Sequence, residues 1–431
     1  LVLTAPQASN PTWPAPPKRL RDKLNWVRAT CPPIGPGVIR TPHGSMPPCS
    51  DMWQHWEASA SFVHESLSDP VLEPTALDAL FHSSSNPSQV HQWRQEVIED
   101  IREWISEGQA ALQAWQSALP QHVRLALSND SAHGVVVVPV IVALLRELGY
   151  PDWQGIEEDL SLGSKLLGWT RPCPGWEPRR DQKYSAPISV EVLRKVNRQH
   201  VEEALRRRRP DPHWEDLLRE ISTEVREGRM AGPFKGPEDW PRKTVGAPGY
   251  PDISELLPLP PGDVIASLAF SVVQTGSDGK KKVRRCEDWR RSHHNDAFGA
   301  SDIPKHHTIQ SFVDCCRQLR SRGFDCEIFG EDLEGAYRQW PVFEPRHTYM
   351  ILMTPSGPML FRHHSMPFGS AASVWQFNRI IDSVQFIVRV LLLIAFLHYV
   401  DDLGGAAALE DASNASSTLR SFFHEIGIKL K

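Results

Sequence analysis

The 431-residue chain has few cysteines, and their spacing does not match a metal module. The seven cysteines include no CxxC pair, and their odd number does not suit a framework of disulfides. The His-His pairs lack the spacing of helical metal ligands, so we interpret them as loop histidines. These absences predict reduced thiols and an intracellular protein, nuclear or cytoplasmic, without a zinc site.

A leader sequence and a long hydrophobic run are also missing. Residues 1–6 have neither a basic start nor an apolar centre, so they do not resemble a secretory signal peptide. The longest apolar stretch, residues 384–400, contains Arg389 and His398 and is too short to span a membrane. We therefore expect that the protein is not secreted and has no membrane partner.

Positive charge is not in excess, since the formal net charge is −5. The protein is therefore not coated in basic surface, although nucleic-acid binding needs only a local basic face. The contents of 40% hydrophobic and 23% charged residues predict a mostly globular chain, long enough for two or three domains. Because the chain begins with Leu1 and stops at Lys431 inside a continuing pattern, we expect a fragment of a longer product.

Regional composition predicts two segments in the first half of the chain. Residues 1–85 are rich in Pro, Ser and Trp without periodicity, so we expect an irregular or partly disordered segment. Residues 86–230 are predicted to form a helical region of unknown role, because apolar side chains recur at helical spacing. The Arg run at 206–209 is either a solvated helix end or a patch that contacts phosphate. The expected helices cover about 87–105, 140–148, 190–208 and 214–227, the first with Asn86 as N-cap.

The second half of the chain has a different pattern. From about residue 260, short apolar runs separated by turn signals predict strands, with one helix near 308–320. The expected strands include Val264-Ile265, Val272-Val273, Ile328-Phe329 and residues 349–352. This half is therefore predicted to be α+β.

Residues 399–402 read Tyr-Val-Asp-Asp and directly follow an apolar run. Adjacent carboxylates at the tip of a buried hairpin repel each other, and burial raises the cost further. A divalent cation removes both penalties, so Asp401 and Asp402 suggest a metal site. A pair of aspartates in a tight turn is also compatible with an ordinary solvated turn.

A third carboxylate, Asp332, follows another predicted strand, and Ala336 and Tyr337 come four and five residues after it. A carboxylate at a strand end, packed against the Asp-Asp turn, can hold two divalent ions roughly 3.5–4 Å apart. Phosphoryl transfer depends on such positioning and charge neutralisation more than on protein nucleophiles. Taken alone, Asp332 fits an exposed acid at a strand end better than a metal ligand.

Two further motifs flank these acids. Residues 365–377 contain a Pro-Phe-Gly turn and then a helix whose first turn carries only small side chains. Such a helix start lets a flat group such as a base pair approach the backbone, or packs tightly against a sheet. Residues 279–291 carry seven basic side chains, and strand alternation would place Lys280, Lys282 and Arg284 on one face. That face would grip a triphosphate or a strand backbone, or form a solvated hairpin.

In this order, the four motifs resemble those of the reverse transcriptases of retroelements, which are RNA-directed DNA polymerases. The resemblance covers roughly residues 215–431, and it implies an α+β right-hand fold of fingers and palm after a mostly helical N-terminal region. Residues 231–325 would form a fingers-like region with the basic hairpin. Residues 326–431 would form the palm, an antiparallel sheet backed by helices, truncated before the thumb. Glu331 departs from the family, which usually has an apolar or small residue before the catalytic Asp.

The resemblance also implies roles for individual residues. Asp332 and Asp401 would be the principal ligands of two Mg²⁺ ions, or of Mn²⁺ in their place, and Asp402 would support the site. Tyr337 would clash with a ribose 2′-hydroxyl and so favour deoxynucleotides. The remaining implied contacts are Lys280 or Lys282 and Arg284 on the triphosphate, Phe368 and Gly369 along the nucleotide and template, and Met366 and Tyr399 in the floor of the site.

The implied partners are an RNA or DNA template with its primer and deoxynucleoside triphosphates. Two other readings stay open at this point. An RNA-templated RNA polymerase shares the palm, although the aromatic Tyr337 argues against it. A truncated, inactive retroelement remnant would bind nucleic acid without turnover.

Overall fold

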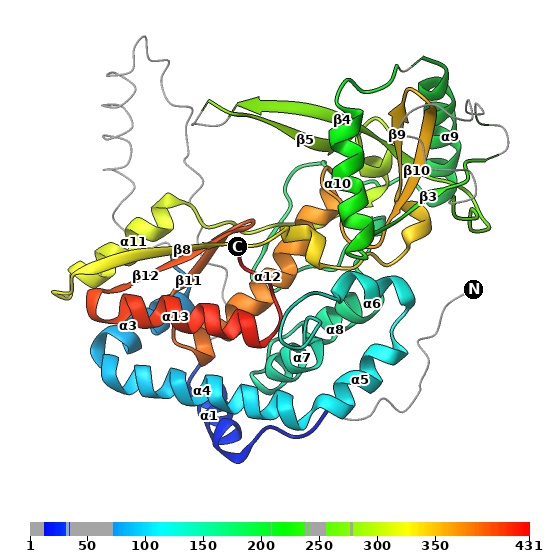
Figure 1. The fold of residues 1–431 in the computed structure, drawn as a ribbon. Coiled ribbons are helices and arrows are strands. Elements are labelled where there is room, and N and C mark those ends of the chain that lie inside the picture. Colours follow the sequence, from blue (N-terminus) through cyan, green and yellow to red (C-terminus); the bar gives the residue numbers. More distant parts are fainter. Residues whose placement is uncertain are drawn as a thin grey trace, which may run out of the picture.

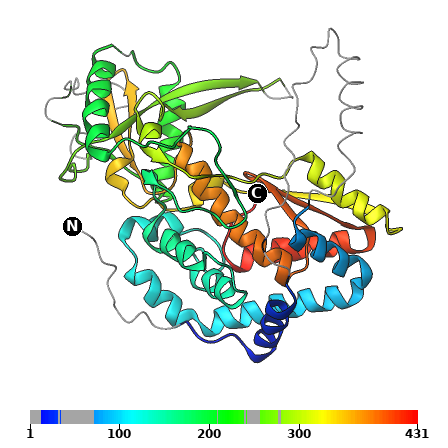
Figure 2. The ribbon, with the colours of Figure 1, turned by 180° about the vertical axis from the view of Figure 1, so that it is seen from behind.

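The computed structural model describes residues 13–31, 34, 72–207, 209–237, 240, 256–275 and 279–431. These residues form a mixed α+β structure, as predicted, in which helices dominate the first half and most strands follow residue 230. Figure 1 shows the five-stranded and the three-stranded sheet with helix α12 between them, and Figure 2 shows the same arrangement from behind.

The helices of the described residues have the following bounds: α1 Lys18–Thr30, α3 Pro74–Ser85, α4 Pro87–Glu107, α5 Gln109–Ala118, α6 Gln121–Leu127, α7 Val138–Glu147, α8 Trp153–Leu162, α9 Val190–Arg207, α10 Trp214–Arg226, α11 Ile309–Arg320, α12 Ala371–Leu391 and α13 Leu409–Glu425. The four helices predicted between 86 and 230 and the helix near 308–320 are therefore present. Asn86 occupies the N-cap position of α4, but its side chain makes no capping hydrogen bond.

The expectation of an irregular segment over residues 1–85 is wrong for two stretches, which form α1 and α3. In α1, Leu20, Leu24 and Val27 are buried at helical spacing, and the charged residues around this narrow stripe hid it. In α3 the buried face consists mainly of Ala and Ser, which resemble loop composition until a partner covers them. Most other residues of the 1–85 segment lie outside the described residues.

The strands have the following bounds: β1 Gly168–Trp169, β2 Glu177–Pro178, β3 Met230–Phe234, β4 Ala266–Thr275, β5 Lys281–Glu287, β6 Phe298–Gly299, β7 Asp302–Ile303, β8 Cys326–Asp332, β9 Tyr349–Thr354, β10 Gly357–His363, β11 Phe396–Tyr399 and β12 Asp402–Ala408. Val264-Ile265, predicted as a strand, precedes β4 instead. One of the turn signals between the predicted strands, Ser277-Asp278-Gly279, lies mostly outside the described residues.

The larger sheet has the strand order β3-β10-β9-β4-β5, with β4 parallel to β9 and its other pairs antiparallel. Helix α9 covers one face, where Val201 and Ala204 join the cluster of Leu268 and Ile351. Helix α10 covers the other face through Leu217 and Ile221. The packing therefore crosses the expected boundaries at 230 and 325, because α9 and α10 come from the first region and β9 and β10 from the last.

The smaller sheet is antiparallel, with the strand order β11-β12-β8. Successive residues of its strands enter two different cores, as strand alternation requires. Leu397 and Ala406 pack with α3 and α11, whereas Phe396 and Leu403 belong to the main core, which contains α4, α12 and α13. Both faces of the sheet are therefore covered by helices.

The N-terminal helices are bound to this sheet by a buried arginine. Arg94 of α4 is fully buried, and its guanidinium donates hydrogen bonds to the carbonyl oxygens of Leu392 and Leu393, at 2.7 and 2.8 Å. The same guanidinium forms an ion pair with the buried Asp411 of α13. Arg94 therefore holds the turn through which the chain passes from α12 into β11.

None of the helices in the described ranges combines the length and the apolar character needed to cross a membrane.

Candidate active site

The three aspartates singled out from the sequence lie at one end of the smaller sheet. Asp332 is the last residue of β8 and Asp402 is the first residue of β12, and the two are directly opposite in the antiparallel register. Tyr399 pairs with Asp402, so Val400 and Asp401 form a two-residue turn between β11 and β12. The strand order thus brings together acids that are separated by about 70 residues in sequence.

The turn that carries Asp401 is strained. Val400 has a φ of 55°, in the left-handed region that β-branched residues rarely adopt. Such a conformation costs about 1–3 kcal/mol and persists only where the surrounding structure enforces it. Here the pairing of β11 with β12 on both sides of the turn enforces it, which fixes the direction of the Asp401 backbone.

The acids influence one another electrostatically. Burial raises the pKa of the Asp401 carboxyl, and the Asp402 and Asp332 carboxylates raise it further, while Lys431 opposes them. The Lys431 ammonium forms an ion pair with Asp332, and the Lys431 backbone N–H donates to the Asp332 carbonyl oxygen at 2.8 Å. One cation therefore already lies against this group of three carboxylates.

This electrostatic arrangement predicts that Asp401 destabilises the fold at neutral pH. A carboxyl whose pKa is raised by folding weakens the folded state as the pH rises through that pKa, because ionisation is easier in the unfolded chain. Asp401→Asn should therefore raise Tm at pH 7 in the absence of divalent cations, and the gain should shrink as the solution is acidified. Differential scanning fluorimetry from pH 4 to 8 measures this. Asp325→Asn, at an exposed position directly before β8, is the control, and an equal rise in both variants would contradict the prediction.

Tyr337 stands beside Asp401. Its ring contacts Phe368, with ring centroids 5.3 Å apart, and Phe377, at 4.9 Å and nearly perpendicular. Burial and the nearby Asp401 carboxylate raise the pKa of Tyr337 to about 12, so the phenol stays protonated at neutral pH. The structure therefore joins Tyr337 and Phe368 in one aromatic wall next to the aspartates.

The other predicted residues around this wall differ in exposure. Phe368 and Tyr399 are 42% and 54% exposed, whereas Met366 is fully buried in the main core. Gly369 has a φ of 91°, and a Cβ there would lie 2.6 Å from the Glu287 carbonyl oxygen. Met366 therefore supports the site from within, and Gly369 allows the end of β5 to approach closely.

The basic hairpin consists of β4 and β5, and Figure 1 shows it extending outward from the edge of the larger sheet. Lys282 and Arg284 lie on its exposed face, as the strand alternation predicts, while Arg285 and Glu287 are buried on the other face. Lys280 is exposed but precedes the strand. A role for these cations in binding a triphosphate stays a prediction.

The donor atoms at the site are those that Mg²⁺ prefers, because all three side chains are carboxylates. In the described part of the chain, however, no group of three or more His, Cys, Asp or Glu side chains is arranged to hold a metal ion. The Lys431 ammonium pairs with Asp332, at a carboxylate oxygen that a metal would use. A metal at this site therefore remains a prediction.

Comparisons with known proteins do not assign the chain to a family. No protein-family model matches it, and a search of curated proteins found no match.

Proposed function

We propose that the chain is the fingers and palm part of an RNA-directed DNA polymerase of a mobile element, acting inside the cell. One observation carries the proposal: Asp332 and Asp402 are opposite each other on adjacent strands, with Asp401 in the turn beside them. Carboxylates gathered in this way repel one another unless a cation neutralises them. Divalent cations at such a site serve phosphoryl transfer.

Each of these residues would have a separate role in binding metal or nucleotide. Asp332 and Asp401 would hold two Mg²⁺ ions, with Asp402 in support, after the Lys431 ammonium leaves Asp332. When bound, the ions supply charge that activates the primer 3′-hydroxyl and stabilises the departing pyrophosphate. Tyr337, protonated and half-buried, would present a neutral ring edge to the sugar of the incoming deoxynucleotide. Exposed Lys282 and Arg284 would bind phosphate oxygens of the nucleotide or the template.

Primer extension on an RNA template with deoxynucleotides tests the proposal. We expect extension that requires Mg²⁺ or Mn²⁺ and that Asp401→Asn abolishes, because the amide lacks the charge needed to hold a metal. Asp325→Asn serves as the matched control and should extend like the unmodified protein. Extension that survives in Asp401→Asn would refute the assignment of this site.

Two alternatives are distinguished by the same assay. An RNA-templated RNA polymerase would prefer ribonucleotides, and the bulk of Tyr337 beside Asp401 argues against it. A remnant that only binds nucleic acid is supported by the Asp332–Lys431 ion pair, which competes with a metal. Binding of a primer–template without extension under any metal would favour this second alternative.

A further inference from the structure

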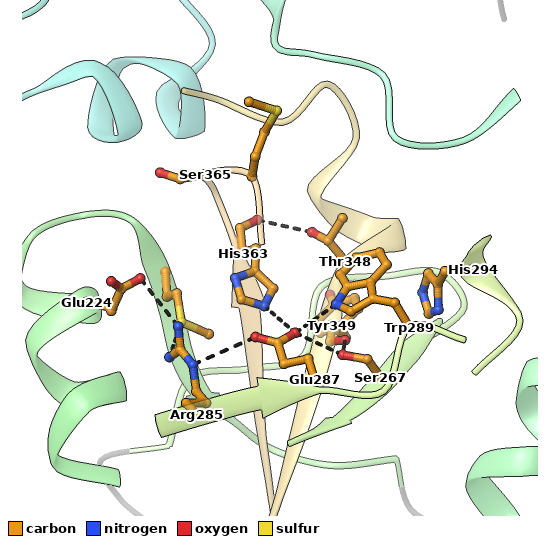
Figure 3. Close-up of polar contacts among 12 residues, drawn as sticks. Glu224, Ser267, Arg285, Glu287, Trp289, His294, Thr348, Tyr349, His363 and Ser365 are labelled. Atoms are coloured by element: carbon orange, nitrogen blue, oxygen red, sulfur yellow. Dashed lines mark hydrogen bonds and ion pairs between the residues drawn. The ribbon is translucent and has the colours of Figure 1, made fainter. Parts of the chain in front are cut away.

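A buried group of charged residues lies where the end of β5 meets β10. Figure 3 shows its centre, the Glu287 carboxylate, toward which His363, Trp289 and Ser267 point. One carboxylate oxygen of Glu287 accepts hydrogen bonds from Ser267 Oγ at 3.0 Å, Trp289 Nε1 at 3.1 Å and His363 Nε2 at 3.0 Å. Burial raises the pKa of Glu287, but the contact with His363 and the nearby guanidinium groups of Arg285 and Arg338 outweigh burial and hold that pKa below its usual value. Glu287 is therefore an ionised carboxylate inside the protein.

His363 connects this carboxylate to a second buried charge. Its Nδ1 lies 3.2 Å from Nη1 of Arg338. A guanidinium can only donate, so a hydrogen bond between these two atoms requires Nδ1 to accept and places the imidazole proton on Nε2, which faces Glu287. Burial lowers the pKa of His363 and the Glu287 carboxylate raises it, but with Arg338 and Arg285 nearby the net shift of the pKa is downward, which agrees with a neutral ring. His363 thus lies between the buried Glu287 carboxylate and the buried Arg338 guanidinium.

Arg338 in turn holds the aromatic wall. It directly follows Tyr337, and its Nη1 donates to the carbonyl oxygens of Ser365 and Met366, each at 2.9 Å. Its Nε donates to the Glu224 carboxylate at 2.6 Å, and the whole side chain is buried. The guanidinium therefore joins the segment that carries Tyr337 to the segment that leads into Phe368.

Glu287 also reaches the same loop through its backbone. Gly369, the residue after Phe368, approaches the Glu287 carbonyl oxygen so closely that a Cβ would lie 2.6 Å from it. The end of the basic hairpin is thus in contact with the wall by two routes, one through side chains and one through the backbone. Buried hydrogen-bonded networks of this kind restrict motion more than separate contacts do.

We infer that Glu287 and His363 are positioning residues for nucleotide selection, acting through Arg338 on the wall of Tyr337 and Phe368. The inference rests on the proposed function and goes beyond it, since the proposed function gives no role to Glu287 or His363. A displacement of about 1 Å at a reacting centre can cost about 10²-fold in rate. Loosening the wall should therefore change sugar discrimination more than it changes the fold.

The test is Glu287→Gln, which keeps the size of the side chain and removes its charge. We expect the ratio of kcat/KM for a deoxynucleotide to that for the matching ribonucleotide to fall about tenfold. This is less than the roughly 10²-fold effect of displacing a reacting group directly, because Glu287 acts only through Arg338. Glu220→Gln is the matched control, because Glu220 also pairs with Arg285 but is half-exposed on α10. A purely structural defect would lower both kcat/KM values together and leave their ratio unchanged.

His363→Gln is the second variant. Its amide can still donate to Glu287, but it lacks the ring nitrogen Nδ1 that faces Arg338. Each variant is also combined with Tyr337→Val, and the two effects on the ratio should not add, because both act on the same wall. Additive effects, or an unchanged ratio in folded variants, would overturn the inference while leaving the polymerase proposal intact. Failure of both variants to fold, judged by thermal unfolding, would also overturn it. Absence of extension by the unmodified protein would refute the proposed function and the inference with it.

Discussion

Asp332→Asn is expected to lower primer extension by about 10³-fold or more, because several kcal/mol of metal-dependent charge stabilisation would be lost. Asparagine has nearly the same shape, and the backbone pairing of residue 332 with Asp402 does not use the side chain. The fold and the affinity for primer–template should therefore stay close to those of the unmodified protein. Single-turnover extension and a binding titration by fluorescence anisotropy measure the two quantities separately.

The matched control for this prediction is the neighbouring residue. Glu331 precedes Asp332 on β8, so its side chain lies on the opposite face, where it pairs with Arg420 of α13. Glu331→Gln should retain most of the extension activity. An equal loss in both variants would mean that the damage comes from β8 as a whole and not from a ligand at residue 332.

Tyr337→Val is expected to lower the preference for deoxynucleotides over ribonucleotides by about 10²-fold, because steric rejection by one side chain has about that size. The ring is held between Phe368 and Phe377, so it cannot turn away from a 2′-hydroxyl without disturbing both. Valine removes most of this bulk. Deoxynucleotide use should fall by less than about tenfold, since the aspartates are not changed.

Tyr337→Phe separates the ring from its hydroxyl. The phenylalanine keeps the ring and its contacts with Phe368 and Phe377, so discrimination should be retained. Competition between labelled deoxynucleotide and ribonucleotide on one template measures both variants directly. If phenylalanine and valine relaxed the preference equally, selection would depend on the hydroxyl, and the steric role of Tyr337 would be wrong.

The sequence was sufficient to single out the three aspartates that lie together in the structure, because Asp401 and Asp402 follow a strong apolar run and Asp332 follows a shorter one. Their juxtaposition depends on the strand order β11-β12-β8, which local patterns do not encode. The parallel pairing of β4 with β9, about 80 residues later, is a similar case. This pairing joins strands from both sides of residue 325, where the sequence predicts the division between fingers and palm.

Other features lacked any local signal. Glu287, His363 and Arg338 are charged or polar residues that a sequence would assign to the surface, and their burial depends on partners far along the chain. The Ala and Ser residues of α3 are compatible with either a helix or a loop. Only the contact of α3 with the smaller sheet favours the helix. Burial of polar residues is thus the part of this fold that required the three-dimensional structure.

The anchoring of the α12–β11 turn by Arg94 limits how this protein can be divided. Residues 215–431 contain all four motifs, yet the carbonyl groups of Leu392 and Leu393 that precede the Tyr-Val-Asp-Asp hairpin are bound from residue 94. A chain shortened to the motif-bearing part would leave those groups and Asp411 without their cation inside an apolar core. Residues 215–431 alone are therefore not expected to keep the arrangement of the three aspartates, because that arrangement depends on the N-terminal helices as well as on the sheet that carries the aspartates.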